Sequence, residues 1–135
     1  MTSEQEKKRA WLRRAKTAER YVQSLREKIT KDKELAQSLL NSDDLDSLKL
    51  IQKLEQEIQE QWKQIEELLA VRENIKKAIS YLHDDELEEI LTRHYFLCET
   101  IETIAENMHY DRRTIQKKHL KALDKLIMPK ESEMK

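Results

Sequence analysis

Apolar side chains recur along the first third of the chain at alternating spacings of four and three residues. Asp32 is the one polar interruption, and the pattern ends at the polar run 41–44. A heptad pattern of this kind predicts a long helix that packs along a single seam. The positions of this first stripe are Trp11, Ala15, Ala18, Val22, Leu25, Ile29, Ala36 and Leu39.

A second heptad stripe follows the polar run, with Gln61 and Arg72 in two of its slots. Two long helices joined by a short turn become antiparallel neighbours, so we expect a hairpin over residues 4–80 with its turn near residue 43. Each helix should be about 50 Å long at roughly 1.5 Å per residue. The stripe is Leu48, Ile51, Leu54, Ile58, Ile65, Leu68, Ile75, Ile79 and Leu82. The expected opposite pairs are Trp11 with Ile75, Ala18 with Leu68, Val22 with Ile65, and Ile29 with Ile58.

Three shorter helices are predicted after the hairpin. Asp84 and Asp85 begin the first, Thr100 caps the second, and Asp111 caps the third over residues 112–126, because their side-chain oxygens can accept from free first-turn amides. The break at residues 109–111 is as short as the turn of a helix-turn-helix. Their apolar faces are Leu87, Ile90, Leu91 and Tyr95; Ile101, Ile104, Ala105 and Met108; and Ile115, Ala122, Leu123 and Leu126. We expect an all-α fold with a hairpin domain at 1–82, a helix-turn-helix domain at 83–128 and a disordered tail at 129–135.

Composition supports long helices and excludes several classes of protein. Glycine is absent, the one proline is Pro129, and 39% of residues are charged, which argues against tight hairpins of strands and glycine-rich phosphate loops. The single cysteine, Cys98, fits a reducing cytoplasm. No apolar run approaches the roughly 20 residues that span a bilayer. We therefore expect a cytoplasmic protein with no membrane contact and no cofactor.

The net charge of −1 hides two basic segments. Residues 111–128 hold six Lys and Arg against two Asp, and residues 1–28 hold nine Lys and Arg against four Glu. A neutral total is therefore compatible with a basic face that binds nucleic acid. The basic start of the chain could touch DNA or an acidic partner, although we favour a solvated coiled-coil face there.

The candidate DNA contacts gather on the last two helices. A recognition helix reads base edges near its N-terminal end, where this chain has Arg112, Arg113, Gln116 and Lys117. Arg and Lys suit guanine and Gln suits adenine. Thr100 and Thr103, at the start of the preceding helix, are placed to donate to phosphate. Lys121 adds to the positive field.

The stretch from Thr100 to Leu126 resembles, without a gap, the second half of region 4 of bacterial sigma factors. The match rests on Thr100-Ile101-Glu102, Ile104-Ala105, Arg112, Ile115, Lys121-Ala122-Leu123 and Lys125-Leu126. The whole chain is similar to phage-encoded regulators of the ArpU/RinA type. The resemblance implies that Arg112 contacts DNA and that the protein activates late or lytic phage genes. Arg113 stands where sigma factors usually carry Glu, so their promoter preference does not carry over, and Lys118 replaces an apolar residue.

Other polar groups have weaker interpretations. The acidic run 84–89 suits the first turn of a helix better than a metal site, although a polymerase-activating surface is an alternative. The four histidines lack zinc-ligand spacing, and His119 could touch DNA from the recognition helix. Lys118 could lie along the apolar surface or reach phosphate. Tyr110 could touch the DNA backbone, although we favour packing.

These patterns indicate a non-enzymatic, sequence-specific transcription regulator that binds double-stranded DNA, with a homodimer favoured. Two alternatives remain open. One is a small terminase subunit or another DNA-packaging protein, which should form rings. The other is a sigma mimic that docks on RNA polymerase without reading DNA.

Overall fold

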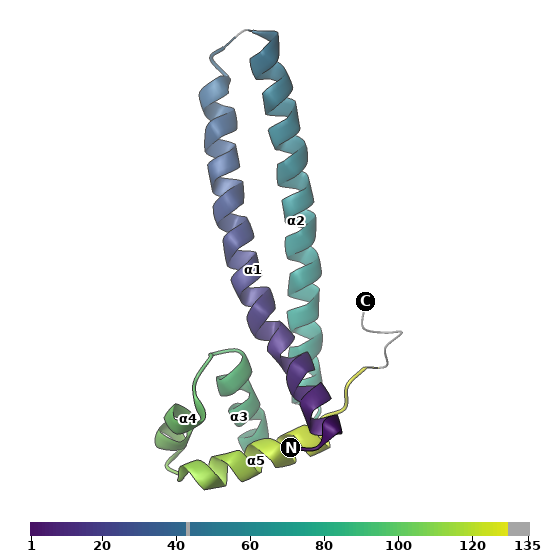
Figure 1. Ribbon diagram of the computed structural model, residues 1–135, viewed down its shortest axis with the longest axis vertical. Helices are drawn as coiled ribbons and strands as arrows, with labels where there is room; N and C mark the ends of the chain where they lie inside the picture. The colour runs from purple at the N-terminus through teal and green to yellow at the C-terminus, as the bar shows by residue number, and fades with distance from the viewer. Residues whose placement is uncertain (43, 130–135) are drawn as a thin grey trace. The chain divides into compact units, whose positions relative to one another are not determined.

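The computed structural model describes residues 1–42 and 44–129, and it contains only helices, turns and loops there (Figure 1). The helices are α1 (Ser3–Leu39), α2 (Leu45–Ser80), α3 (Asp85–Tyr95), α4 (Ile101–Met108) and α5 (Arg112–Lys125). The predicted all-α class, the long antiparallel helix pair and the three following helices are confirmed. Six residues of the predicted tail, 130–135, lie outside the described residues.

Side-chain caps set the starts of these helices. Thr2 and Gln5 exchange bonds at the start of α1: the Gln5 amide donates to Thr2 Oγ1 at 3.1 Å, and the Thr2 amide donates to Gln5 Oε1 at 2.9 Å. This reciprocal capping box satisfies two amides that the helix leaves free. Asp44 accepts from the Ser47 amide at 2.6 Å. Asp84 caps α3 in the same way, accepting from the Leu87 amide at 3.1 Å.

The chain divides into two compact units. One contains Met1–Thr17 together with Val71–Lys135, and we call it the helix-turn-helix unit. The other contains Ala18–Ala70, and we call it the mid-hairpin unit. The domain boundary expected at 82/83 stays a prediction, since these units divide the chain within α1 and α2.

In the mid-hairpin unit, α1 and α2 pack through Val22, Leu25, Ile29, Ile58 and Ile65. The expected pairs Val22 with Ile65 and Ile29 with Ile58 belong to this one cluster. Two of the three polar residues in the stripes also meet, because Gln61 Nε2 donates to Asp32 Oδ2 at 3.2 Å.

The stripe prediction fails at the hairpin turn. Leu48 was expected on the seam but is 50% exposed, and its neighbours Leu45 and Leu50 are exposed as well. Apolar positions next to a hairpin turn have fewer residues of the partner helix beside them, so heptad spacing alone does not bury them.

In the helix-turn-helix unit, one core joins four helices. Trp11, Leu12 and Ala15 of α1 and Ile75 and Ile79 of α2 are buried with three residues of α3, two residues of α5 and the residue that follows α5. These six residues are Leu87, Leu91, Tyr95, Ala122, Leu123 and Leu126. Phe96 packs against the same core, and the predicted position of Tyr95 on the apolar face is confirmed.

Three turn residues have left-handed backbones in a chain without glycine. They are His83, Cys98 and His109, with φ of 52°, 59° and 60°. This conformation favours glycine because a Cβ atom crowds the following carbonyl oxygen. Each helix connection from α2 to α5 therefore contains one conformationally unfavourable residue.

Candidate nucleic-acid interface

A tight turn joins α4 to α5. The helix α4 ends at His109, whose backbone is left-handed, and the Tyr110 amide donates back to the Ala105 carbonyl at 2.9 Å. Asp111 then caps α5, with Oδ1 accepting from the Thr114 amide at 2.8 Å. That bond holds the pKa of the Asp111 carboxyl below its usual value. The predicted N-cap and the predicted start of the recognition helix are both confirmed.

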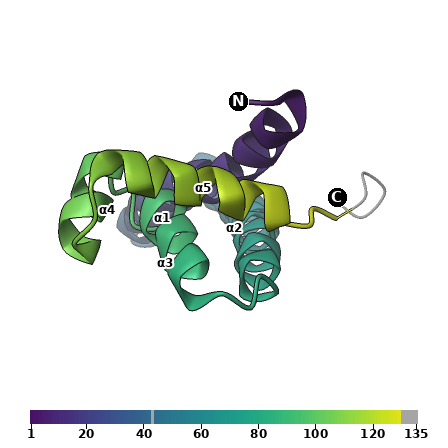
Figure 2. The same ribbon diagram turned by 90° about the horizontal axis from the view of Figure 1, so that it is seen from below.

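A small core holds α4 against α5. Ile104 and Ala105 of α4 are buried with Ile115 of α5 and Ile90 of α3, and Met108 packs at the edge. Figure 2 shows α4 beside the N-terminal end of α5. The expected packing of Met108 with Ile115 across the turn is confirmed, and the arrangement is a helix-turn-helix.

The predicted DNA-contacting residues of α5 are all exposed. They are Arg112, Arg113, Gln116, Lys117 and Lys121. The opposite side of the helix carries Ile115, His119, Ala122 and Leu123, which are buried. The apolar stripe and the polar side chains thus occupy different faces, and the exposed face presents four cations and one amide.

Arg112 is engaged by α4. Its Nε lies 3.2 Å from Glu102 Oε1, and the two side chains are 63% and 58% exposed. An ion pair this exposed contributes roughly 0–1 kcal/mol, so a phosphate or a base edge can replace the carboxylate at little energetic cost.

Thr100 and Thr103 meet at the start of α4. Thr100 Oγ1 accepts from the Thr103 amide at 3.2 Å, which confirms Thr100 as the N-cap. The Thr100 hydroxyl donates to Thr103 Oγ1 at 3.0 Å. Because Thr103 Oγ1 accepts this bond, its own hydroxyl proton points away from Thr100. Both residues are exposed, so this proton can be donated to a phosphate.

Lys118 and Tyr110 bind Glu86 of α3. Lys118 Nζ forms an ion pair with Glu86, and the Tyr110 hydroxyl donates to Glu86 Oε2 at 2.7 Å. The Lys118 ammonium also lies 5.1 Å from the centre of the Tyr110 ring. The hydrogen bond from Lys118, followed by that from Tyr110, lowers the pKa of Glu86. Both side chains therefore tie the turn and α5 to α3.

His119 is not an available DNA contact, which corrects that interpretation. It is 7% exposed, and its Nε2 lies 2.8 Å from the Tyr95 hydroxyl in the core. Burial lowers the pKa of His119 to about 4. The sequence contained the signal, because Ile115, His119, Ala122 and Leu126 have spacings of 4, 3 and 4, which continue the buried stripe.

The N-terminal turns of α1 also belong to this unit, and sequence reasoning missed their contacts with α5. Gln5 Nε2 donates to Asp124 Oδ1 at 2.8 Å, and Lys8 Nζ donates to the Asp124 carbonyl at 3.2 Å. No local pattern signals a contact between residues 119 apart.

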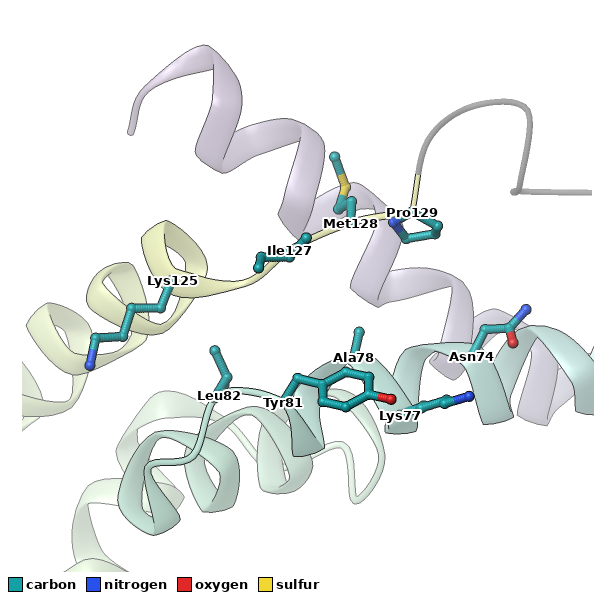
Figure 3. Close-up of a pocket in the computed structure, with 9 residues that line it drawn as sticks. All are labelled: Asn74, Lys77, Ala78, Tyr81, Leu82, Lys125, Ile127, Met128 and Pro129. Atoms are coloured by element: carbon teal, nitrogen blue, oxygen red, sulfur yellow. The ribbon is translucent and has the colours of Figure 1, made fainter.

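A hollow of about 590 Å³ lies near the end of α5, lined by residues of α2 and of the segment after α5 (Figure 3). Its walls contain Tyr81, Leu82, Ile127 and Met128, with Lys77 and Lys125. The described residues contain no cluster of three or more potential metal ligands, and none of their helices is long and apolar enough to cross a membrane. The lining of the hollow includes no carboxylate and no thiol.

Comparison of the chain with protein-family models, curated proteins and solved structures gives no match. The interpretation of this surface therefore depends on its own geometry and chemistry.

Proposed function

We propose that the chain is a sequence-specific, non-enzymatic transcription regulator that binds double-stranded DNA through α5. One observation carries the proposal. The face of α5 opposite its buried stripe presents Arg113, Gln116 and Lys117 to solvent at the N-terminal end of the second helix of a helix-turn-helix. A recognition helix uses these positions to read base edges in the major groove.

Each exposed residue has a role suited to its chemistry. Arg113 and Lys117 can donate to guanine, and Gln116 can pair with adenine. Arg112, once released from Glu102, and Lys121 contact phosphates. The hydroxyls at the start of α4 contact the backbone and orient the helix, since phosphate contacts position a protein without reading sequence.

The proposed biological setting follows from the resemblance to ArpU/RinA-type regulators, namely activation of late or lytic phage genes. One module of this size reads few base pairs. We therefore propose that the protein binds as a homodimer, with RNA polymerase as a further partner.

Selection of duplexes from a random library tests the proposal, because no target site need be known. Wild-type protein should enrich a defined sequence and bind it more tightly than a scrambled duplex in a fluorescence-anisotropy titration. The double variant Arg113→Ala/Lys117→Ala should reduce that preference roughly 30-fold or more, at about 1–3 kcal/mol for each of the two base-reading side chains.

The matched control is Lys53→Ala/Lys63→Ala, which removes two exposed charges from α2 and should bind like wild type. Failure to enrich any sequence, or equal preference in the Arg113/Lys117 variant and the wild type, would overturn the proposal.

A further inference from the structure

The N-terminal part of α1 is built into the same compact unit as the helix-turn-helix. Trp11 and Leu12 are buried in one core with Leu123 and Leu126, and Gln5 bonds to Asp124. Basic side chains on this part of α1 are therefore held in a defined position beside α3 and α5, unlike those of a free helix.

This part of α1 is strongly basic. Residues 7–18 contain six Lys and Arg and no Asp or Glu. Arg9, Arg13 and Lys16 follow one another at spacings of four and three, so they share one side of the helix. We call these three residues the α1 basic row. Trp11, Leu12 and Ala15, which are buried, anchor the helix between them.

Contacts with α3 place the row near the start of α4. Tyr95 of α3 is buried in the same core as Leu12 and Ala15 of α1, and the Tyr95 ring meets the His94 ring edge-on at 4.8 Å. His94 Nδ1 lies 2.8 Å from the carbonyl oxygen of Glu99, the residue that precedes the α4 cap. Burial lowers the pKa of His94, and the positive charges of Lys16, Arg9 and Arg13 lower it further.

The charges of the row are not neutralised within the unit. The ion pairs of Arg93, Arg112 and Lys118 with glutamates do not include a member of the row. Arg9 Nε is buried and has no hydrogen-bond partner. Three cations on one side of a fixed helix, next to the end of α4 that carries Thr100 and Thr103, are complementary to a line of phosphates.

We infer that the α1 basic row binds the DNA backbone and extends the phosphate contacts of α4 beyond the base pairs that α5 reads. The inference rests on the proposed function, and it assigns to the first helix a direct role in affinity. Phosphate contacts carry no sequence information. The row should therefore strengthen binding to every duplex by the same factor.

Counterion release provides a quantitative readout. Each neutralised phosphate contributes about 0.9 to the slope of log affinity against log salt concentration on duplex DNA. Removal of two charges in Arg13→Gln/Lys16→Gln should lower that slope by roughly 2 and weaken binding at low salt. The ratio of affinities for the selected and scrambled duplexes should stay unchanged.

The matched control is Lys76→Gln/Lys77→Gln, which removes two exposed charges from α2 of the same unit. This control should change the slope by less than half of the change expected for Arg13→Gln/Lys16→Gln. Arg13 is exposed, so the single variant Arg13→Gln isolates one charge without disturbing the core and should lower the slope by roughly 1. Thermal melting of each variant confirms that the fold is intact.

The possible outcomes separate the two proposals. A wild-type slope and affinity in the Arg13/Lys16 variants, together with a loss of sequence preference in the Arg113/Lys117 variant, would overturn the α1 basic row and leave the proposed function standing. An equal loss of slope and affinity in the Lys76/Lys77 control would also overturn the inference about the α1 basic row. The loss would then not depend on where the removed charges lie. A wild-type protein that prefers no sequence would overturn the proposed function instead.

Discussion

The Tyr95 hydroxyl and His119 Nε2 lie 2.8 Å apart in the core of the helix-turn-helix unit, and their rings stack with centres separated by 5.8 Å. This pair joins α3 to α5. Because the imidazole is buried beside Arg9 and His94, its pKa falls from 6.5 to about 4. The folded unit therefore favours a neutral His119.

Protonation of His119 should destabilise the protein in mildly acidic solution. The unfolded chain takes up this proton near pH 6.5 and the folded chain only near pH 4, so stability is complete above pH 6.5 and falls as the pH drops through that window. The loss should approach roughly 3 kcal/mol at pH 4, at about 1.4 kcal/mol per pKa unit. Urea unfolding between pH 7.5 and 4.5 measures it. The variant His119→Gln should show a shallower pH dependence, with a remainder from His94, and an unchanged pH dependence would contradict the assignment.

Gln61→Leu should stabilise the mid-hairpin unit. Gln61 is 5% exposed, and its Oε1 is buried without a hydrogen-bond partner, a situation that costs about 1–3 kcal/mol. Leucine removes that cost and fills a heptad slot, while Asp32 is only half-buried and can be solvated. We expect the free energy of unfolding to rise by about 1 kcal/mol in urea titrations. The control is Gln64→Leu at an exposed position, and an equal gain there would show that general hydrophobicity is the cause.

His109→Gly should raise the melting temperature. His109 has φ of 60°, which costs a residue with a Cβ atom about 1 kcal/mol or more. Glycine removes this strain but loses more backbone entropy on folding, so the net gain should be about 0.5 kcal/mol. Glu106→Gly, in the middle of α4, should instead lower stability by about 1 kcal/mol. A lower melting temperature in His109→Gly would mean that the imidazole makes a stabilising contact.

Glu102→Gln should tighten DNA binding. The carboxylate of Glu102 occupies Arg112 and repels phosphate, and its neutral isostere does neither. We expect an affinity gain of several-fold at low salt and almost no change in melting temperature, since exposed ion pairs contribute little. Glu106→Gln, also exposed on α4, is the matched control. Weaker binding by Glu102→Gln would show that Glu102 orients Arg112 for DNA.

Light scattering should give the mass of a dimer. A single module reads few base pairs, and two modules would explain a preference for paired half-sites one helical turn apart. A ring of many subunits would favour the packaging alternative. A monomer without salt-sensitive DNA binding would favour docking on RNA polymerase.

Much of the fold was predictable because its signals are local. Thr100 and Asp111 cap helices through bonds to amides three residues away, and such bonds depend only on the sequence around them. The heptad spacing of α1 and α2 likewise predicted the pairing of Val22 with Ile65. These elements account for the correct helix bounds and for the exposed positions of the α5 candidates.

Contacts between residues that lie far apart in the sequence could not be predicted. Lys118 looked free to reach phosphate, but its ammonium is held by Glu86, which belongs to another helix. The docking of Gln5 on Asp124 joins opposite ends of the chain. His119 was misread because its polar chemistry was given more weight than its position on the buried stripe.

The bond between Gln5 and Asp124 has a consequence for how the protein forms during synthesis. Residues that contact each other across 119 positions close a long loop, which slows folding because entropy is lost before the contact is made. The apolar side of the first α1 turns can pack against α2 and α3 as soon as these are made, but its partners Leu123 and Leu126 follow only at the end of α5. During that interval part of the surface of Trp11 and Leu12 stays open to chaperones and to other nascent chains. The assembly of this unit is therefore a late, non-local event, even though each of its helices is encoded locally.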